Sequence, residues 1–436
     1  MASSSRVCGR VMEEYEGGME NPEGGMWNSE FGRGALGGGV FSFWVEGFLV
    51  VLLRMIYLDH NATTPLAPAA LEAMLPFLRE EFGNPSSSYR LARRARAALE
   101  KAREQVAALL QTQPREVVFT GGATEATQAA LESCLRLQPK REALVVSAME
   151  HSATLRFAEA LEEEGRARVV RVPVDGEGRL LLDELERILS REAAAVVSVM
   201  AANNETGVLQ PIPEIAERCA RAGVPFHCDA AQAVGKIPVD LAGWGVDFAT
   251  LAAHKFSGPK GVGALYVREL LRFVPRQPGG GQEEGRRSGT ENVAGVVGMG
   301  AAAELAGERL AAGELDRVGE LRDEFESGLA EAFPECLFHG RQAERVPTVT
   351  SFSLARVPSA ELLLLLDERG VCASAGSACS SGRPDPSHVL LAMGRSREEA
   401  QNSLRLSLGA ETTRKEVGEA LRILLDSVGK IRSARG

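Results

Sequence analysis

Five polar sequences follow predicted β-strands, and each of them carries groups that could take part in chemistry. The Gly-Gly-Ala-Thr turn at residues 121–124 offers the backbone of Ala123 and the hydroxyl of Thr124 at the start of a helix. Such a turn suits a phosphate, because a helix N-terminus has unpaired N–H groups and a partial positive charge. The other four sequences supply an imidazole, amides, a carboxylate and an amine. These residues are His151, Asn204, Asp229 with Gln232, and His254 with Lys255.

Together these groups meet the needs of pyridoxal 5′-phosphate (PLP) chemistry. Lys255 can form a Schiff base with the cofactor aldehyde. Asp229 can keep the pyridine nitrogen protonated, so that the ring accepts electrons. His151 can lie on the ring face and move protons, and Asn204 and Gln232 can hydrogen-bond the phenolate oxygen of the ring. The set therefore favours a PLP enzyme.

Each residue also fits a structural role when it is taken alone. Asp229 fits a helix cap or a surface acid, and His151 fits a hydrogen-bonded structural histidine. Lys255 lies in a Gly- and Pro-containing sequence, 252–261, that also fits a surface turn. The prediction depends on the order of these residues along the chain, since a polar or ionisable group follows each of five successive strands at the same edge of a sheet.

The surrounding sequence predicts an α/β fold. From about residue 70 to 270, short apolar runs alternate with longer amphipathic stretches, of which 88–110 is the clearest helix. This alternation is typical of βα units around a mostly parallel sheet, where ligands bind beyond the carboxyl ends of the strands. The predicted strands are 116–120, 143–147, 194–200, 224–228, 247–251 and 263–267.

We expect four parts along the chain. Residues 1–54 differ in composition from the rest and are expected to be a disordered extension or a mispredicted start, with an apolar run at 40–53 that is shorter than the roughly 20 residues of a membrane span. Residues 55–70 are expected to join the small domain. Residues 71–310 are expected to form the large PLP-binding domain, and 311–436 a small α+β domain that carries the loop around Cys379.

Composition narrows the class of partner. The chain has 49 Lys and Arg against 59 Asp and Glu, a formal net charge of −10. An acidic chain is poorly suited to bind nucleic acid, which needs clustered cations. The seven cysteines contain no CxxC pair, which argues against a disulfide scaffold or a zinc site. We expect a cytoplasmic protein that needs no metal and no membrane.

Cys379 differs from the other cysteines in its surroundings. It lies in Ala-Ser-Ala-Gly-Ser-Ala-Cys-Ser-Ser-Gly-Arg-Pro, 373–384, a run of small residues with almost no apolar anchor. This composition is typical of a loop, so we interpret Cys379 as a reactive thiol rather than a core residue. Cys372 is expected to pack in the core, and Cys228 is expected to be buried near the cofactor.

Several motifs between Met55 and the C-terminus are shared with a known family. They are Tyr57–Pro65, Gly83–Ser87, Asn203–Gly207, His254–Lys255 with Gly258–Gly261, and Arg287–Thr290. These motifs resemble the cysteine desulfurases, which belong to the class V aminotransferase group of fold-type I (aspartate aminotransferase-like) PLP enzymes. The resemblance implies a homodimer, with its active site at the subunit interface, that converts L-cysteine to L-alanine. The sulfur would be held as a persulfide on Cys379 and passed to an acceptor protein.

The resemblance also implies roles for single residues. Lys255 would form the Schiff base, with Cys379 and His151 as its catalytic partners. Arg405 would bind the substrate carboxylate together with Asn204, as bidentate guanidinium–carboxylate pairs do. Cys379 is also a candidate for transient iron–sulfur ligation. The implied phosphate contacts are Ala123, Thr124, His254 and Thr290, the last reaching the cofactor of the other subunit.

Two positions depart from the family pattern. The family has Ser three residues before the Schiff-base lysine, where this chain has Ala252. It has Asn four residues after the threonine of the phosphate turn, where this chain has Gln128. We expect weaker cofactor retention rather than a different reaction, because Lys255, Asp229 and His151 are present.

Several alternatives remain open from the sequence. A selenocysteine lyase or another class V aminotransferase-like enzyme would use the same fold, and a catalytically weakened scaffold would keep the fold without the reaction. Cys379 argues against a transaminase, which needs no thiol. The acceptor is also open, because iron–sulfur scaffolds, tRNA thiolation and thio-cofactor synthesis would each take sulfur from such an enzyme.

Overall fold

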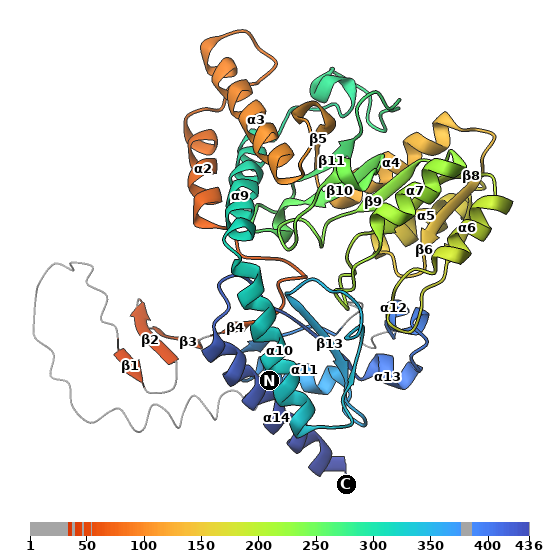
Figure 1. Cartoon of the computed structure of the whole chain (residues 1–436). Coiled ribbons are helices and arrows are strands. Elements are labelled where there is room, and N and C mark those ends of the chain that lie inside the picture. The colour runs from red at the N-terminus through yellow and green to blue at the C-terminus, as the bar shows by residue number, and fades with distance from the viewer. Residues whose placement is uncertain (1–33, 37–39, 46–47, 54, 376–385, 436) are drawn as a thin grey trace, which may run out of the picture. The chain divides into compact units, whose positions relative to one another are not determined.

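The structure is a computed structural model that describes residues 34–36, 40–45, 48–53, 55–375 and 386–435 (Figure 1). The chain divides into two compact units, Met1–Arg54 and Met55–Gly436. The first unit has three antiparallel strands that the sequence analysis did not predict, and the status of residues 1–54 as an extension or a mispredicted start stays a prediction. These strands are β1 (Gly34–Leu36), β2 (Val40–Val45) and β3 (Phe48–Leu53).

A seven-stranded sheet forms the centre of the second unit, in the order β5-β11-β10-β9-β8-β6-β7. Only β11 runs antiparallel to its neighbours, so the predicted mostly parallel α/β fold is confirmed. The edge strand β7 was not predicted, because charged residues interrupt its short apolar run. The strands are β5 (Val117–Thr120), β6 (Ala143–Ser147), β7 (Arg168–Val172), β8 (Ala194–Met200), β9 (Phe226–Asp229), β10 (Phe248–Ala252) and β11 (Gly263–Val267).

Both faces of this sheet are buried under helices (Figure 1). Val117 and Phe119 of β5 point into one core cluster, whereas Val118 points into the other, as the period of two in a strand requires. One face packs against α2 (Pro68–Arg79), α3 (Arg90–Leu109), α7 (Ile212–Ala222), α6 (Leu182–Arg191) and α9 (Val293–Ala311), and the other packs against α4 (Ala123–Leu137) and α5 (Ser152–Glu163).

A separate core lies in the C-terminal part of the chain. Its strands β12 (Leu337–Phe338), β13 (Val349–Ser353) and β15 (Ser403–Ser407) form an antiparallel sheet. Phe352, Leu404 and Leu406 of these strands are buried in this core. Strand β4 (Ile56–Tyr57) pairs with β14 (Val371–Cys372), so the N-terminal segment contributes to this part. The remaining helices are α8 (Leu241–Trp244), α10 (Glu314–Ala332), α11 (Ser359–Asp367), α12 (His388–Ala392), α13 (Arg397–Gln401) and α14 (Arg414–Arg435).

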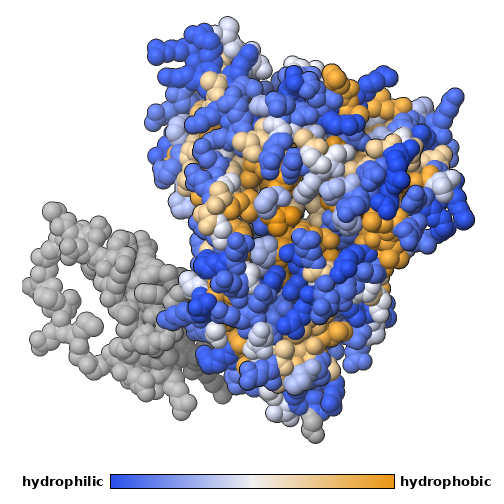
Figure 2. All heavy atoms as spheres, in the orientation of Figure 1, coloured by the Kyte–Doolittle hydropathy of each residue, from blue (hydrophilic) through white to orange (hydrophobic). Residues whose placement is uncertain are grey.

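No helix within the described residues combines the length and the apolar character that crossing a bilayer requires. On the face of the second unit shown in Figure 2, hydrophilic residues cover most of the surface, and apolar residues gather in patches between them. The boundary between the large and small domains near residue 310 stays a prediction.

A buried ion pair ties the Gly-rich segment after β11 to the edge of the sheet. Arg103 donates to both carboxylate oxygens of Glu283, at 2.7 and 2.9 Å, and also to the carbonyl of Val117 at 2.8 Å. Glu283 accepts a further hydrogen bond from the backbone of Phe119 at 2.9 Å. Glu283 and Glu284 both have a positive φ, of 50° and 57°, which strains non-glycine residues. The ion pair therefore holds a strained segment in place.

We expect Arg103→Met to lower the free energy of unfolding by about 3–5 kcal/mol, because it leaves the buried Glu283 carboxylate without its cation. Urea unfolding followed by circular dichroism measures this change. The matched control is Arg414→Met, which removes an exposed pair with Glu324 and should cost no more than about 1 kcal/mol. Equal losses in the two variants would contradict the structural role of the buried pair.

Candidate active site

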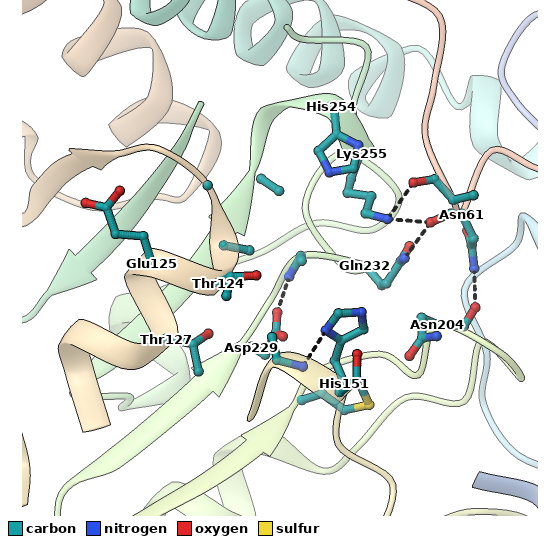
Figure 3. A pocket seen from close by; sticks show the side chains of 18 of the residues that line it. Asn61, Thr124, Glu125, Thr127, His151, Asn204, Asp229, Gln232, His254 and Lys255 are labelled. Carbon is teal, nitrogen blue, oxygen red and sulfur yellow. Dashed lines mark hydrogen bonds between the residues drawn. The ribbon is translucent and has the colours of Figure 1, made fainter. Parts of the chain in front are cut away.

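A cavity of about 1050 Å³ opens beyond the carboxyl ends of the central strands (Figure 3). Strand ends meet there because neighbouring parallel strands finish at the same edge. The cavity wall includes nine of the residues singled out from the sequence, and all but Arg405 end or follow strands of the central sheet. They are Ala123, Thr124, His151, Asn204, Asp229, Gln232, His254, Lys255 and Arg405.

The turn between β5 and α4 forms one end of the cavity. Gly122 has a φ of 151°, which only glycine adopts readily, and a Cβ at Gly263 would lie 2.8 Å from the Gly122 backbone. The backbone N–H of Gly121 already donates to the Glu125 carboxylate at 2.7 Å, and Glu125 pairs with Arg287 at 2.7 Å. The helix start at Ala123 therefore remains as the anion-binding part of the turn.

The two departures from the family pattern lie at this end as well. Ala252 is part of the cavity wall, where its methyl group offers no hydrogen bond. Gln128 also lines the cavity, and its side-chain oxygen accepts a hydrogen bond from Arg276. Weaker cofactor retention at this end stays a prediction.

Asp229 ends β9 in the interior of the site. One of its carboxylate oxygens accepts a hydrogen bond from the backbone of Ala231 at 3.0 Å. Burial raises the pKa of Asp229, while the Ala231 N–H group and the nearby His151 and Lys255 act in the opposite direction. A positive partner would thus stabilise this carboxylate in its ionised form.

His151 follows β6 and caps helix α5. Its Nδ1 accepts a hydrogen bond from the backbone of Ala153 at 3.1 Å. In the neutral ring the proton must then lie on Nε2. Desolvation lowers the pKa of His151, and so do the positive charges of Lys255 and His388, whereas Asp229 opposes the shift. The imidazole is therefore set to act as a neutral group with one defined proton.

Lys255 lies in a short 3-10 turn, Ala253–Lys255, directly after β10. Its Nζ donates to the carbonyls of Asn61 at 2.6 Å and Ala62 at 2.9 Å (Figure 3). Burial lowers the pKa of Lys255 to about 8, Arg405 lowers it too, and the carboxylates Asp229 and Asp59 oppose the shift. A neutral amine, the form that attacks a carbonyl, is therefore available near neutral pH.

His254 precedes Lys255 and contacts the N-terminal segment. Its Nδ1 lies 3.2 Å from the hydroxyl of Thr63, and its carbonyl accepts hydrogen bonds from the backbone and hydroxyl of Thr64. Burial, followed by the charges of Lys255 and two other lysines, lowers the pKa of His254 to about 4. The ring therefore stays neutral at physiological pH.

Arg405 of β15 brings the C-terminal part of the chain into the site. Its Nη1 donates to the carbonyl of Asn204 at 2.9 Å, and its Nη2 pairs with Asp59 at 2.6 Å. Its Nε is buried and has no hydrogen-bond partner among the described residues. The Nε–H group is thus left for a further acceptor, such as a carboxylate.

Two predicted residues are not placed in the cavity. Thr290 is exposed and does not line the cavity of this single chain, so its contact with the cofactor of another subunit stays a prediction. Cys379 lies outside the described residues. Cys228 is buried, as expected, and Cys372 is only half-buried. Within the part of the chain that the structure describes, no group of three or more His, Cys, Asp or Glu residues could hold a metal.

The segment that contains Cys379 leaves and re-enters the described structure at this cavity. Ser374, just before it, exchanges backbone hydrogen bonds with Arg405 at 2.7 and 3.2 Å. Ser387, just after it, donates its hydroxyl to Glu205, and His388 contacts the carbonyl of Glu150 at 3.0 Å. Both flanks of the cysteine segment are therefore fixed to the site.

Four further residues contribute to the site without having been predicted. Asn61 was noticed only as part of a motif, although the run Asp-His-Asn-Ala-Thr-Thr contains several polar residues beside an apolar start. Lys236 follows Gln232 by four residues in an apolar stretch, which is a signal for a buried lysine. Glu150 and Glu205 each directly adjoin a predicted residue. They are buried, and burial raises the pKa of both.

The donor set of this cavity fits PLP. The helix N-terminus at Ala123 and Thr124 suits a phosphate. Asp229 is a buried carboxylate that a cation would stabilise, and a protonated ring nitrogen is such a cation. Lys255 supplies an amine with a lowered pKa, and the cavity volume accommodates a cofactor of this size together with a small substrate.

Comparison with known proteins gives one family for most of the chain. Residues 56–420 match the model of the class V aminotransferases. A cysteine desulfurase of Enterobacter agglomerans is 44% identical over 382 residues, which cover 87% of this chain and 94% of that protein.

Solved structures lead to the same group. A NifS-like protein superimposes with a TM-score of 0.80 at 36% identity, covering 86% of this chain and 100% of that chain. SspA, solved in complex with cysteine, has a TM-score of 0.71 at 32% identity and covers 82% of this chain and 99% of its own.

In the cofactor-free protein, we expect the extent of acetylation of Lys255 to reach half of its plateau value near pH 8. The reason is that burial and Arg405 disfavour the charged form of this lysine. Competitive acetylation followed by peptide mass spectrometry measures this midpoint, and a free lysine derivative in the same sample supplies the usual lysine pKa of about 10.4. In Arg405→Met the Lys255 midpoint should move upward, because a nearby cation is removed. Identical titration of Lys255 and the free lysine derivative would contradict this description.

Proposed function

The chain belongs to the cysteine desulfurases, within the class V aminotransferase family of PLP-dependent, fold-type I enzymes, and we propose that Cys379 takes the sulfur of L-cysteine as a persulfide. The products are L-alanine and a Cys379 persulfide that passes to an acceptor. The observation that carries the proposal is that the segment bearing Cys379 has both flanks bonded to the cavity of Lys255.

Different residues bind the different polar groups of PLP and of the substrate. Ala123, Thr124 and His254 hold the phosphate of PLP, Asp229 pairs with its ring nitrogen, and Gln232 and Asn204 contact its ring oxygen. When bound, PLP supplies an electron sink that stabilises negative charge at the substrate α-carbon. Arg405 holds the substrate carboxylate, and its buried and unpartnered Nε favours this role.

Proton transfer falls to Lys255 and His151. The lowered pKa of Lys255 keeps much of the amine neutral near pH 8, so that it can take the proton from the substrate α-carbon. His151 has its Nδ1 occupied by Ala153, which leaves Nε2 to give or accept a proton near the substrate. In this proposal Lys255 removes a proton from the substrate, and His151 gives or accepts a proton in the same reaction.

Cys379 carries out the sulfur transfer. Its thiolate attacks the substrate sulfur, which forms an S–S bond and breaks the bond between that sulfur and the substrate β-carbon. Cys379 is four residues beyond Ala375, so the covalent chain limits its reach from there to roughly 14 Å.

A homodimer is part of this proposal. Leu71 and Leu78 are exposed one heptad apart on α2, and Phe82, just beyond the helix, is 77% exposed. Such an apolar row fits burial against a second copy of the chain. Thr290 is exposed as well. A residue that contacts the cofactor of the partner subunit must be exposed when one chain is taken alone. The acceptor is a sulfur carrier or an iron–sulfur scaffold in the cytoplasm.

We expect Cys379→Ala to keep bound PLP and to bind L-cysteine, but to lose sulfide release by at least about 100-fold, because the attacking thiolate is absent. Sulfide assays with a reductant, and visible spectra before and after L-cysteine, measure the two properties. Cys372→Ala is the control, since Cys372 is outside the cavity wall and should retain activity. Undiminished sulfide release by Cys379→Ala would refute the role of this thiol.

A further inference from the structure

Lys236 is a buried lysine that the reaction described above does not use. It is 6% exposed and lies in the turn after β9, four residues beyond Gln232. Its Nζ donates to the side-chain oxygen of Asn61 at 2.7 Å and to the side-chain oxygen of Gln232. Within the described residues no carboxylate forms an ion pair with it, so its partners are two neutral amides.

The Gln232 amide is held on both sides. Its oxygen faces Lys236, and its nitrogen donates to the backbone carbonyl of Asn61 at 3.0 Å (Figure 3). A flipped amide would place two oxygens against each other at Asn61 and withdraw the acceptor from Lys236. An amide nitrogen carries two hydrogens, and Asn61 uses one of them. The second hydrogen remains for the cavity, which Gln232 lines.

We propose that Lys236 is a positioning residue that orients Gln232 as a hydrogen-bond donor toward the ring oxygen of the cofactor. The inference rests on the proposed function and deepens it. Lys236 does not touch the cavity itself, because its contacts are with Asn61 and Gln232. Its effect on the cofactor is transmitted through the amide that it holds.

The hydrogen bonds of Lys236 fit this role. Burial lowers its pKa well below the usual lysine value, and the charges of Lys255 and Arg405 lower it in the same direction. The two amide oxygens each accept one N–H of Lys236. Asn61 is satisfied as well, since its side-chain nitrogen donates to the carbonyl of Asn204 at 3.0 Å. The network thus leaves one amide hydrogen of Gln232 directed to a ligand.

The first test measures PLP binding to Lys236→Met, which keeps the bulk and removes the donors. The dissociation constant of PLP should rise about tenfold, as expected when one hydrogen bond to a charged oxygen is misdirected. The absorbance maximum of the bound cofactor should also shift, and in the same direction as in Gln232→Met. A dissociation constant and a maximum equal to those of the unmodified protein would overturn the proposal.

The matched control for lost buried hydrogen bonds is Gln210→Met. Gln210 is buried, accepts from the backbone of Leu180 at 2.8 Å and donates to the carbonyl of Gly178 at 2.8 Å, away from the cavity wall. It should lower the thermal midpoint of the cofactor-free protein to a similar extent as Lys236→Met. It should leave the PLP dissociation constant and the absorbance maximum unchanged.

The second test is the double variant Lys236→Met/Gln232→Met. If Lys236 acts through Gln232, its loss adds less than twofold to the PLP dissociation constant in the Gln232→Met background. Additive effects would overturn the proposal, since Lys236 would then act independently. The double variant also removes the Gln232 oxygen, one of the two that Lys236→Met leaves without a donor, so the comparison remains available if the single variant does not fold.

The outcomes separate the two levels of the account. An unmodified protein that binds no PLP would refute the proposed function and this inference together. An unmodified protein that binds PLP, with a Lys236→Met variant that matches it, would refute the inference alone.

Discussion

The site depends on the burial of three basic side chains, Lys255, Lys236 and Arg405, around the carbonyl and amide groups of Asn61 and Asn204. Burial disfavours the charged form of an amine, and a nearby positive charge disfavours it further. The pKa values of both lysines therefore fall. Asp229 and Asp59 offset only part of this effect. The lowered pKa suits the role of nucleophile and base that we propose for Lys255.

Asn61 connects parts of the chain that are far apart in sequence. Its backbone N–H donates to the Ser407 hydroxyl at 2.9 Å, its carbonyl accepts from Lys255 and Gln232, and its side chain joins Lys236 to Asn204. The N-terminal segment, the strand ends of the large sheet and β15 thus converge on one residue. This convergence also explains why the flanks of the cysteine segment, bonded to Arg405 and Glu205, lie beside the same cavity.

The sequence was sufficient to predict which polar side chains meet at the strand ends. Asp229, Lys255 and His151 each follow a short apolar run, and a parallel sheet makes such positions converge without knowledge of any contact. Asn61 escaped prediction because its role arises from hydrogen bonds across long sequence separations, which no local pattern carries. The sequence around Lys236 signals burial, but its contact with Asn61, 175 residues away, has no local signal. The same holds for β7, a short edge strand with charged residues, and for the pairing of β4 with β14. Cys379 was recognised from the composition of its loop, and its action in the reaction remains a prediction.

The most direct test of the central claim is the product balance of the purified protein with L-cysteine and a reductant. The account predicts a yellow protein, and the formation of alanine and sulfide in equal amounts without a keto acid. A colourless protein, or a yellow protein that forms a keto acid and no sulfide, would contradict the assignment of sulfur transfer to this site.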